Sequence, residues 1–238
     1  MTTTAIGDPA GQDTPSTTEP TRTRGRVLTL VGSTVRAHVG RIQHGYRDDR
    51  PDAVAALARL RRGAGRPAGE LPDLWGMTGT DTLYAEAPDW GERRMEQAEQ
   101  ALHIAVTLWA LHQQSHRSAA MHITGGPELG VAVRRLMPDS GAFDDRILRR
   151  FVRTATASSL PVLAQRLRDL VLLLRQADIP LDYGLLADQL YQWQQPAGPA
   201  AVHRAWGRAF HAYRPPAPAT SKTPTTPDTA PDSDKDAQ

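Results

Sequence analysis

Two histidines at helical spacing are the first residues that could support catalysis through a metal ion. His112 and His116 stand four residues apart, so on a helix both imidazoles could face one zinc ion. A third ligand could come from His122 or Glu96. Alternatively, the two histidines form a pair at a helix end, where they cap backbone carbonyl groups or contact a partner. We favour this alternative because no carboxylate sits between the two histidines, and we predict no metal site and no other cofactor.

Two pairs of carboxylates have the right residue type for acid–base catalysis. Glu96 and Glu99 are preceded by two arginines, which favours a solvated ion-pair face. Asp144 and Asp145 fall in the first turn of a predicted helix, where the helix dipole favours negative charge. The chain has no cysteine, which excludes thiol catalysis, disulfides and cysteine-ligated metals. We therefore predict that the protein is not an enzyme.

Arginine clusters are the stronger functional signal, since 26 of the 28 basic residues are arginine. One cluster falls within eight residues, and no acid occurs between Ala53 and Gly69. A second region holds an arginine pair and then a stripe at positions i, i+3, i+4 and i+7 of a predicted helix. The candidate nucleic-acid-binding residues are Arg59, Arg61, Arg62, Arg66, Arg134, Arg135, Arg146, Arg149, Arg150 and Arg153.

Positive charge that faces away from a core suits a phosphate backbone, because each guanidinium can form two parallel hydrogen bonds with one phosphate. The alternative is an ordinary solvated face, and GC-rich coding can by itself raise the ratio of arginine to lysine. The clusters have no neighbouring acids to pair with, so we favour nucleic-acid binding. No zinc finger, basic zipper or RNA-recognition motif is present, so base-specific recognition is not indicated.

Helices are the elements that must position these residues. Apolar residues recur every three or four positions near 27–46, 51–60, 93–116, 128–137, 143–152, 160–174, 182–193 and 202–213. Ser159 and Asp182 are predicted N-caps, and the glycines and prolines from Gly63 to Pro72 predict a loop. No segment alternates with the period of a strand. The sequence predicts an all-α fold of two packed helical sub-bundles.

The two ends of the chain differ from its middle in composition. Residues 1–25 and 214–238 are rich in threonine and proline, and we expect both to be disordered tails. Between them we expect an N-terminal helical bundle at 26–117 and a C-terminal helical bundle at 118–213. The formal net charge of +2 hides this division, because residues 22–213 carry +6 and the remainder carries −4.

The sequence lacks the apolar segments that membranes require. Its longest apolar run is five residues, against the roughly 20 of a membrane-spanning helix. The N-terminus has no pattern of basic residues followed by an apolar stretch. We expect a soluble cytoplasmic protein with no membrane partner.

The order of several sequence strings resembles one known family. The strings are LARLRRGAGRP with LPDLW (57–67 and 71–75), TLWALHQQS (107–115), LGVAVRRL (129–136), RRFVRTATASSLPVLAQRLRDLVLLLR (149–175), IPLDYGLLADQLYQW (179–193) and RAWGRAF (204–210). Together they cover nearly all of residues 27–213. In this order they resemble CasB, the small subunit of the type I-E CRISPR surveillance complex (Cascade), particularly its actinobacterial members.

The resemblance implies an all-α subunit without catalytic activity that is present in two head-to-tail copies per complex. It implies partners in the large subunit, the backbone subunits and the subunit that caps the guide RNA's 3′ hairpin. It further implies contacts with the guide RNA, the target DNA and the displaced DNA strand.

The same resemblance assigns the arginines to two regions of the family. Arg59, Arg61 and Arg62 match the basic end of one helix, and Arg134, Arg135, Arg149, Arg150 and Arg153 match a second basic region. One departure concerns Val131, since many members carry arginine directly after the Leu-Gly that is Leu129-Gly130 here. The match to the family is therefore weaker at that position, and the threonine- and proline-rich tails lie outside the resemblance.

Overall fold

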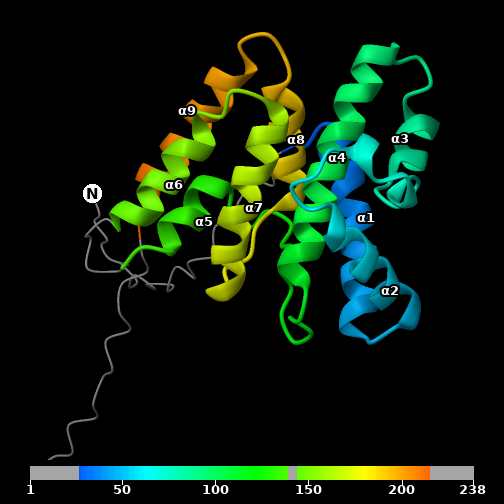
Figure 1. The fold of residues 1–238 in the computed structure, drawn as a ribbon, viewed down its shortest axis with the longest axis horizontal. Coiled ribbons are helices and arrows are strands. Elements are labelled where there is room, and N and C mark those ends of the chain that lie inside the picture. The colour runs from blue at the N-terminus through cyan, green and yellow to red at the C-terminus, as the bar shows by residue number, and fades with distance from the viewer. Residues whose placement is uncertain (1–26, 139–143, 215–238) are drawn as a thin grey trace, which may run out of the picture.

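The computed structural model describes residues 27–138 and 144–214 as an all-α fold (Figure 1). The helices are α1 (Leu30–Arg47), α2 (Pro51–Leu60), α3 (Thr80–Glu86), α4 (Glu92–Gln113), α5 (Leu129–Arg135), α6 (Asp145–Ala155), α7 (Leu160–Gln176), α8 (Tyr183–Trp193) and α9 (Gly198–Ala212), with the 3₁₀ turns η1 (Arg61–Gly63), η2 (Ala68–Glu70) and η3 (Pro72–Leu74). The described residues contain no strand and one isolated parallel bridge, between His122 and Leu181. The predicted all-α class is confirmed. Apart from Arg214, the predicted tails lie outside the described residues, as does Phe143 at the predicted start of α6.

Helix α4 lies at the centre of the fold. Every residue from Ala101 to Gln113 is buried, and most of these side chains are apolar, so this stretch is enclosed on all sides of the helix. Helices α1, α2, α7 and α8 pack around it. None of the described helices is long and apolar enough to cross a membrane.

Helix α5 packs along α9, at the other side of the fold (Figure 1). Gly130 marks their closest approach, since a Cβ atom added there would lie 2.1 Å from the carbonyl oxygen of Trp206. Helix α6 covers the end of α9 through Phe151, whose ring stacks on Phe210 at 5.3 Å between centroids. The arginine-rich α6 is thereby fixed at the periphery.

Helix α1 begins at Leu30, three residues after the predicted start at Val27. Its first turn is capped by Asp188 of α8, whose carboxylate accepts hydrogen bonds from the backbone nitrogens of Thr29 (2.8 Å) and Gly32 (2.7 Å). The Thr29 hydroxyl donates to the same carboxylate at 2.5 Å. Val27 precedes this cap and is 95% exposed, so its apolar side chain does not extend the helix. Periodicity alone overestimated the helix because the cap comes from a distant segment.

Helix α3 was not predicted, and it lies between the glycine-rich loop and α4. It has seven residues, of which only Leu83 is buried, so it has no apolar periodicity to reveal it. Gly79 precedes it with φ of +89°, a left-handed conformation that glycine adopts at little cost.

The side chains from both predicted bundles meet in one hydrophobic cluster, in which Leu102 of α4 and Leu170 of α7 are both fully buried. Helix α4 contacts α1 and α2 as well as α7 and α8. The boundary between residues 117 and 118 stays a prediction.

Candidate nucleic-acid interface

The arginine stripe of α6 lies on the solvent face of that helix, as its spacing predicted. Asp144 caps the helix by accepting hydrogen bonds from the backbone nitrogens of Arg146 (2.8 Å) and Ile147 (3.3 Å). Phe151 is 5% exposed and anchors the opposite face. The four arginines of the stripe are all exposed: Arg146, Arg149, Arg150 and Arg153.

The charge of this stripe is not neutralised by the described part of the protein. None of the four guanidiniums forms an ion pair or a hydrogen bond with another described residue. The carboxylates nearest in sequence, Asp144 and Asp145, stabilise the start of the helix, where the dipole favours negative charge. The stripe therefore presents fixed positive charge to solvent.

The first arginine cluster differs from what we predicted. Arg59 and Arg61 are exposed and have no ion-pair partner among the described residues. Arg62, however, lies 3.1 Å from Asp73, and Arg66 lies 3.4 Å from Glu70. The expectation of unpaired charge was wrong for these two residues.

The reason is the fold of the glycine- and proline-rich loop. Its 3₁₀ turns η2 and η3 carry Glu70 and Asp73 back towards the arginines that precede them. The absence of acids between Ala53 and Gly69 therefore did not predict the local charge. Because both pairs are about half exposed, each contributes at most about 1 kcal/mol to stability.

Arg134 and Arg135 occupy the last turn of α5, where positive charge complements the helix dipole. Arg134 is half-buried and has an interaction partner. The Arg135 guanidinium lies over the ring of Tyr213, 5.4 Å from its centroid. Both arginines therefore already have structural contacts, unlike those of α6.

Helix α7 lies between the two arginine clusters, which the sequence reasoning did not anticipate. Arg166 donates a hydrogen bond to the carbonyl oxygen of Arg153 on α6. Arg168 lies against Gly65, where an added Cβ would be 2.9 Å from the Arg168 Cδ atom. Side chains that are two residues apart on a helix point to roughly opposite sides, so each of these arginines contacts a different neighbour. The sequence shows two arginines two positions apart, but their neighbours are known only from the packing of α7 in the fold.

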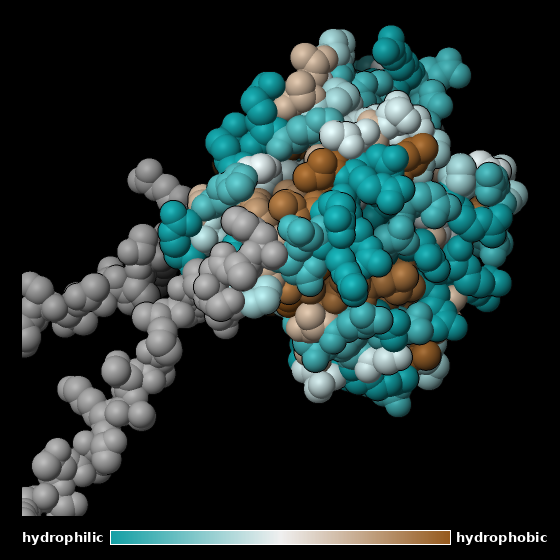
Figure 2. Space-filling model, turned by 60° about the vertical axis from the view of Figure 1, so that its left-hand side comes forward, coloured by the Kyte–Doolittle hydropathy of each residue, from teal (hydrophilic) through white to brown (hydrophobic). Residues whose placement is uncertain are grey.

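We treat the arginines at the end of α2 and in the loop after it, of α7 and of α6 as one surface, because α7 contacts α6 and its Arg168 lies beside Gly65 of that loop. We call it the arginine strip, and it consists of Arg59, Arg61, Arg62, Arg66, Arg146, Arg149, Arg150, Arg153, Arg166 and Arg168. Asp169 of α7 is exposed next to Arg168 and is an acid within this surface. Figure 2 brings the α6 side of the molecule forward and shows mostly hydrophilic side chains with apolar patches between them.

The two histidines with metal-ligand spacing do not share a helix, and their ring nitrogens have different partners. Helix α4 ends at Gln113, and Ser115 has φ of +71°, so His116 lies beyond the helix. The His112 Nδ1 atom lies 2.9 Å from the Tyr183 hydroxyl, whereas His116 Nδ1 lies 3.0 Å from a carboxylate oxygen of Asp178. Burial lowers the pKa of His112 to about 3, and the proximity of His116 and Arg175 contributes to this shift.

His122 and Glu96 do not complete a ligand set either. The His122 Nδ1 atom accepts a hydrogen bond from the backbone nitrogen of Tyr183 at 3.1 Å. Glu96 lies about four turns before His112 on α4, where it accepts a hydrogen bond from Gln100 at 3.1 Å. Within the ranges that the structure describes, no group of three or more histidines and carboxylates could hold a metal ion.

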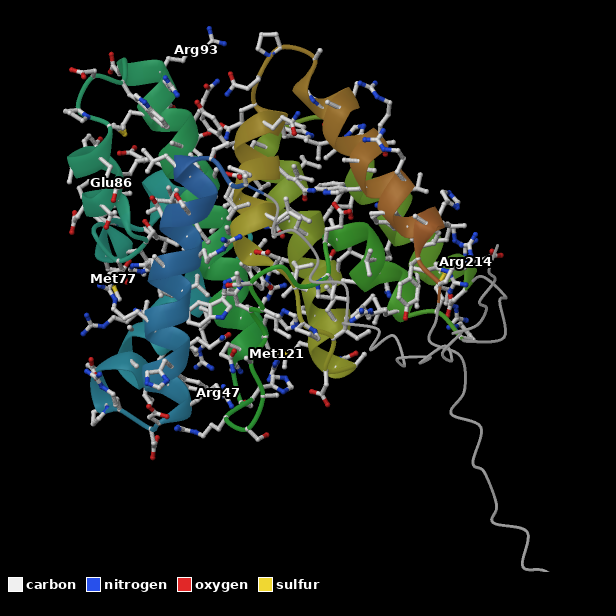
Figure 3. All side chains as sticks on the ribbon, turned by 180° about the vertical axis from the view of Figure 1, so that it is seen from behind. Arg47, Met77, Glu86, Arg93, Met121 and Arg214 are labelled. Carbon is white, nitrogen blue, oxygen red and sulfur yellow. The ribbon has the colours of Figure 1, made fainter. Side chains whose placement is uncertain are left out.

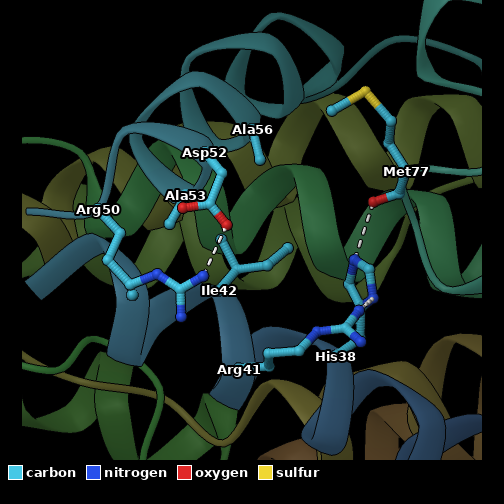
Figure 4. Close-up of a pocket in the computed structure, with 9 residues that line it drawn as sticks. His38, Arg41, Ile42, Arg50, Asp52, Ala53, Ala56 and Met77 are labelled. Atoms are coloured by element: carbon cyan, nitrogen blue, oxygen red, sulfur yellow. Dashed lines mark hydrogen bonds and ion pairs between the residues drawn. The ribbon is translucent and has the colours of Figure 1, made fainter. Parts of the chain in front are cut away.

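A hollow of about 350 Å³ between α1, α2 and the loop before α3 is lined by several polar side chains (Figure 4). Arg41 donates a hydrogen bond to His38 Nδ1 at 3.1 Å, which leaves Nε2 to donate to the carbonyl oxygen of Met77 at 2.9 Å. Arg50 and Asp52 pair with each other at 3.1 Å. Burial lowers the pKa of His38, which keeps the imidazole neutral. The polar groups of this hollow are committed to one another.

Comparison with known proteins identifies relatives over most of the chain. The family described as CRISPR-associated protein Cse2 matches residues 56–211. The crystal structure of CasB from Thermobifida fusca is similar at 54% sequence identity with a TM-score of 0.71, over 78% of this chain and 99% of that chain.

Two further structures are more distant. A chain of a CRISPR RNA-guided surveillance complex shares 25% identity with a TM-score of 0.55, over 76% of this chain and 94% of that chain. A Cse2-family protein from Thermus thermophilus shares 22% identity and a TM-score of 0.56, over 76% and 98% of the two chains, which shows a common fold. No curated protein matches the chain.

Proposed function

The chain belongs to the CRISPR-associated Cse2 family, and from this premise we propose that it is a non-catalytic, nucleic-acid-binding subunit of a type I-E Cascade complex. In this role it stabilises the R-loop, in which guide RNA pairs with target DNA and the other DNA strand is displaced. The similarity to a chain of a CRISPR RNA-guided surveillance complex supports this setting.

The arginine stripe of α6 is the observation that carries the proposal. Arg146, Arg149, Arg150 and Arg153 are exposed, and their guanidiniums have no partner among the described residues. A guanidinium that is already bonded to a carboxylate must give up that contact before it binds phosphate. The α6 arginines have no such cost, so they are ready to bind a nucleic-acid backbone.

Backbone contacts alone are sufficient for this role. In RNA-guided recognition, base pairing with the guide supplies sequence specificity, and the protein needs only to hold the strands. Formation of an R-loop is a nearly balanced exchange of one duplex for another, so a few phosphate contacts can decide its direction.

The proposed partners follow from the same role. They are the guide RNA, the target DNA and its displaced strand, together with the large subunit, the backbone subunits, the hairpin-capping subunit and a second copy of this chain. The proposed location is the cytoplasm, where such a complex would meet invading DNA in antiviral defence.

A helical scaffold subunit whose arginines contact only protein partners is the second candidate. The pairs Arg62–Asp73 and Arg66–Glu70 favour it, because they show arginines of this surface already bonded to carboxylates. Under this alternative, the α6 stripe would meet acidic side chains of a neighbouring subunit.

Replacing two arginines of α6 distinguishes the candidates. In a reconstituted complex, we expect Arg149→Ala with Arg150→Ala to weaken retention of target DNA while assembly stays intact. The matched control is Arg41→Ala with Arg93→Ala, which removes the same charge from exposed positions outside the arginine strip. Normal DNA retention with failed assembly would establish the scaffold function instead.

A further inference from the structure

Trp75 is held on the surface by the loop that precedes α3. Its side chain is 71% exposed, whereas the flanking Leu71 and Leu74 are 8% and 2% exposed and anchor the loop. The Trp75 backbone nitrogen donates to the carbonyl oxygen of Pro72 at 3.1 Å. No ring or guanidinium in the described part of the chain covers the indole. The loop therefore presents an open aromatic face in a fixed place.

A groove of about 420 Å³ lies beside this indole. One wall runs from Leu74 to Thr80, the first residue of α3, and the other is the side of α4 that carries Glu96, Glu99 and Gln100. In the view of Figure 3, Met77 of this loop and Glu86 at the end of α3 lie along the same edge of the molecule.

The groove carries negative charge in defined positions. Glu96 and Glu99 are about one helical turn apart on α4, so they share one face. Gln100 donates a hydrogen bond to Glu96 at 3.1 Å, and the Tyr84 hydroxyl donates to Glu99 at 2.5 Å. Neither carboxylate has an ion-pair partner among the described residues, although two arginines precede them in sequence.

No positive charge offsets these carboxylates within the groove. No arginine or lysine lines it, and its one histidine, His103, donates from Nε2 to the Arg66 carbonyl oxygen at 3.0 Å. Burial lowers the pKa of His103, so the imidazole is neutral near pH 7. The groove is thus anionic, with an aromatic wall.

We propose that this groove binds an arginine side chain of a partner protein, with the guanidinium stacked on Trp75 and bonded to Glu96 and Glu99. The partner is another subunit of the same complex, so this part of the inference rests on the proposed function. The molecule already contains an arginine–tryptophan stack of the required kind, with the Arg94 guanidinium 3.8 Å from the centre of the Trp90 ring.

Charge decides between a protein and a nucleic acid as occupant. A base could stack on Trp75, but its phosphate would then approach two carboxylates that no cation in the groove neutralises. A guanidinium gains from both features, because its plane stacks on an aromatic ring and its five donors match carboxylate oxygens. Lysine has no planar group to stack, so arginine is the residue expected.

Titration of the full chain with short peptides tests the groove directly. The probes are a peptide with two arginines between glycines and its lysine counterpart, followed through the indole N–H signals in NMR. The Trp75 signal is assigned by its loss in Trp75→Phe. We expect the arginine peptide to shift this signal and to bind about three-fold more tightly than the lysine peptide.

Two variants test the roles of the charges and of the ring. Glu96→Gln with Glu99→Gln retains oxygen acceptors for Gln100 and Tyr84 and should weaken the arginine peptide about five-fold. Trp75→Phe should retain binding that Trp75→Ala loses, as followed on the remaining amide signals. No shift at Trp75, equal binding of both peptides, a stronger shift with a DNA oligonucleotide, or self-association through this face would each overturn the inference.

The assembled complex gives the second readout. Trp75→Ala should lower the amount of this chain that co-purifies with the other subunits, while DNA binding by the free chain is unchanged. The variant Arg149→Ala with Arg150→Ala should give the reverse pattern. If both variants bind DNA as well as the unmodified protein, the proposed function is contradicted, and the groove is then tested by assembly alone. Failure of the proposed function and failure of the groove inference are therefore distinguishable.

Discussion

Exchanging two arginines of α6 for alanine should change the salt dependence of DNA binding more than exchanging two arginines of the preceding cluster. The first variant is Arg149→Ala with Arg150→Ala, and the second is Arg62→Ala with Arg66→Ala. Both remove two positive charges from exposed positions of the arginine strip. Net charge alone therefore predicts equal effects, and any difference must come from the ion pairs.

The size of the difference follows from counterion release. Each arginine that neutralises a phosphate of duplex DNA adds about 0.9 to the slope of log affinity against log salt. The α6 variant should reduce this slope by about 1.8. The ratio of the DNA affinity of the unmodified protein to that of this variant should then decrease about ten-fold between 50 and 200 mM salt.

The paired arginines should give a smaller change. Arg62 and Arg66 lie 3.1 and 3.4 Å from Asp73 and Glu70, so phosphate must displace a carboxylate that is already bound. We expect this variant to reduce the slope by less than one unit. Since all four side chains are exposed, neither variant should shift the thermal midpoint by more than a few degrees.

Fluorescence anisotropy of a labelled duplex, measured at four or more salt concentrations, provides the assay. The result that refutes the reasoning is an equal loss of slope in both variants, because the ion pairs would then not limit access to phosphate. A slope close to zero for the unmodified protein would refute direct binding altogether.

Three further predictions concern charge, pH and packing. Asp169→Asn should raise DNA affinity about two-fold at low salt, because it removes a carboxylate from the arginine strip; unchanged anisotropy titrations would contradict this. The lowered pKa of His112, about 3, means that the unfolded state binds its proton first, so His112 alone should lower the free energy of unfolding by about 2.3 kcal/mol from pH 6.5 to 4.5. His38, His103 and His122 also have lowered pKa values and add to this loss, so urea unfolding should show a fall of at least that size, and a flat profile would contradict the burial. Gly130→Ala should cost about 1–3 kcal/mol in the same assay because its Cβ meets Trp206, while the control Gly207→Ala, which has open space, should cost nothing.

Local signals in the sequence predicted every described α-helix except α3, and they predicted two of the caps. Ser159 accepts a hydrogen bond from the backbone nitrogen of Val162 at 3.5 Å, and Asp182 accepts one from Leu185 at 3.1 Å, as their positions before apolar runs indicated. Such caps need only neighbours within three residues, so a single sequence contains the information.

Contacts between distant segments could not be predicted in the same way. Nothing near Thr29 shows that its helix is capped by Asp188, and nothing near Arg153 shows that Arg166 will contact its carbonyl. The prediction of the solvent face of α6 was correct, because helix periodicity determines which residues share that face. The charge state of the first cluster was wrong at two arginines because it depends on how the loop up to Asp73 folds.

The cap of α1 also sets the order in which the newly made chain can complete its fold. Gly32 and the carboxylate that it bonds are 156 residues apart in sequence. At a synthesis rate of about 5–20 residues per second, the first helix waits about 8–30 seconds after its own synthesis for its partner to be made. During that interval its apolar side, with Val31, Val35 and Val39, cannot find the α8 surface that later covers it. Helix α1 is thus the earliest of the described helices to be synthesised and among the last to be stabilised by its cap.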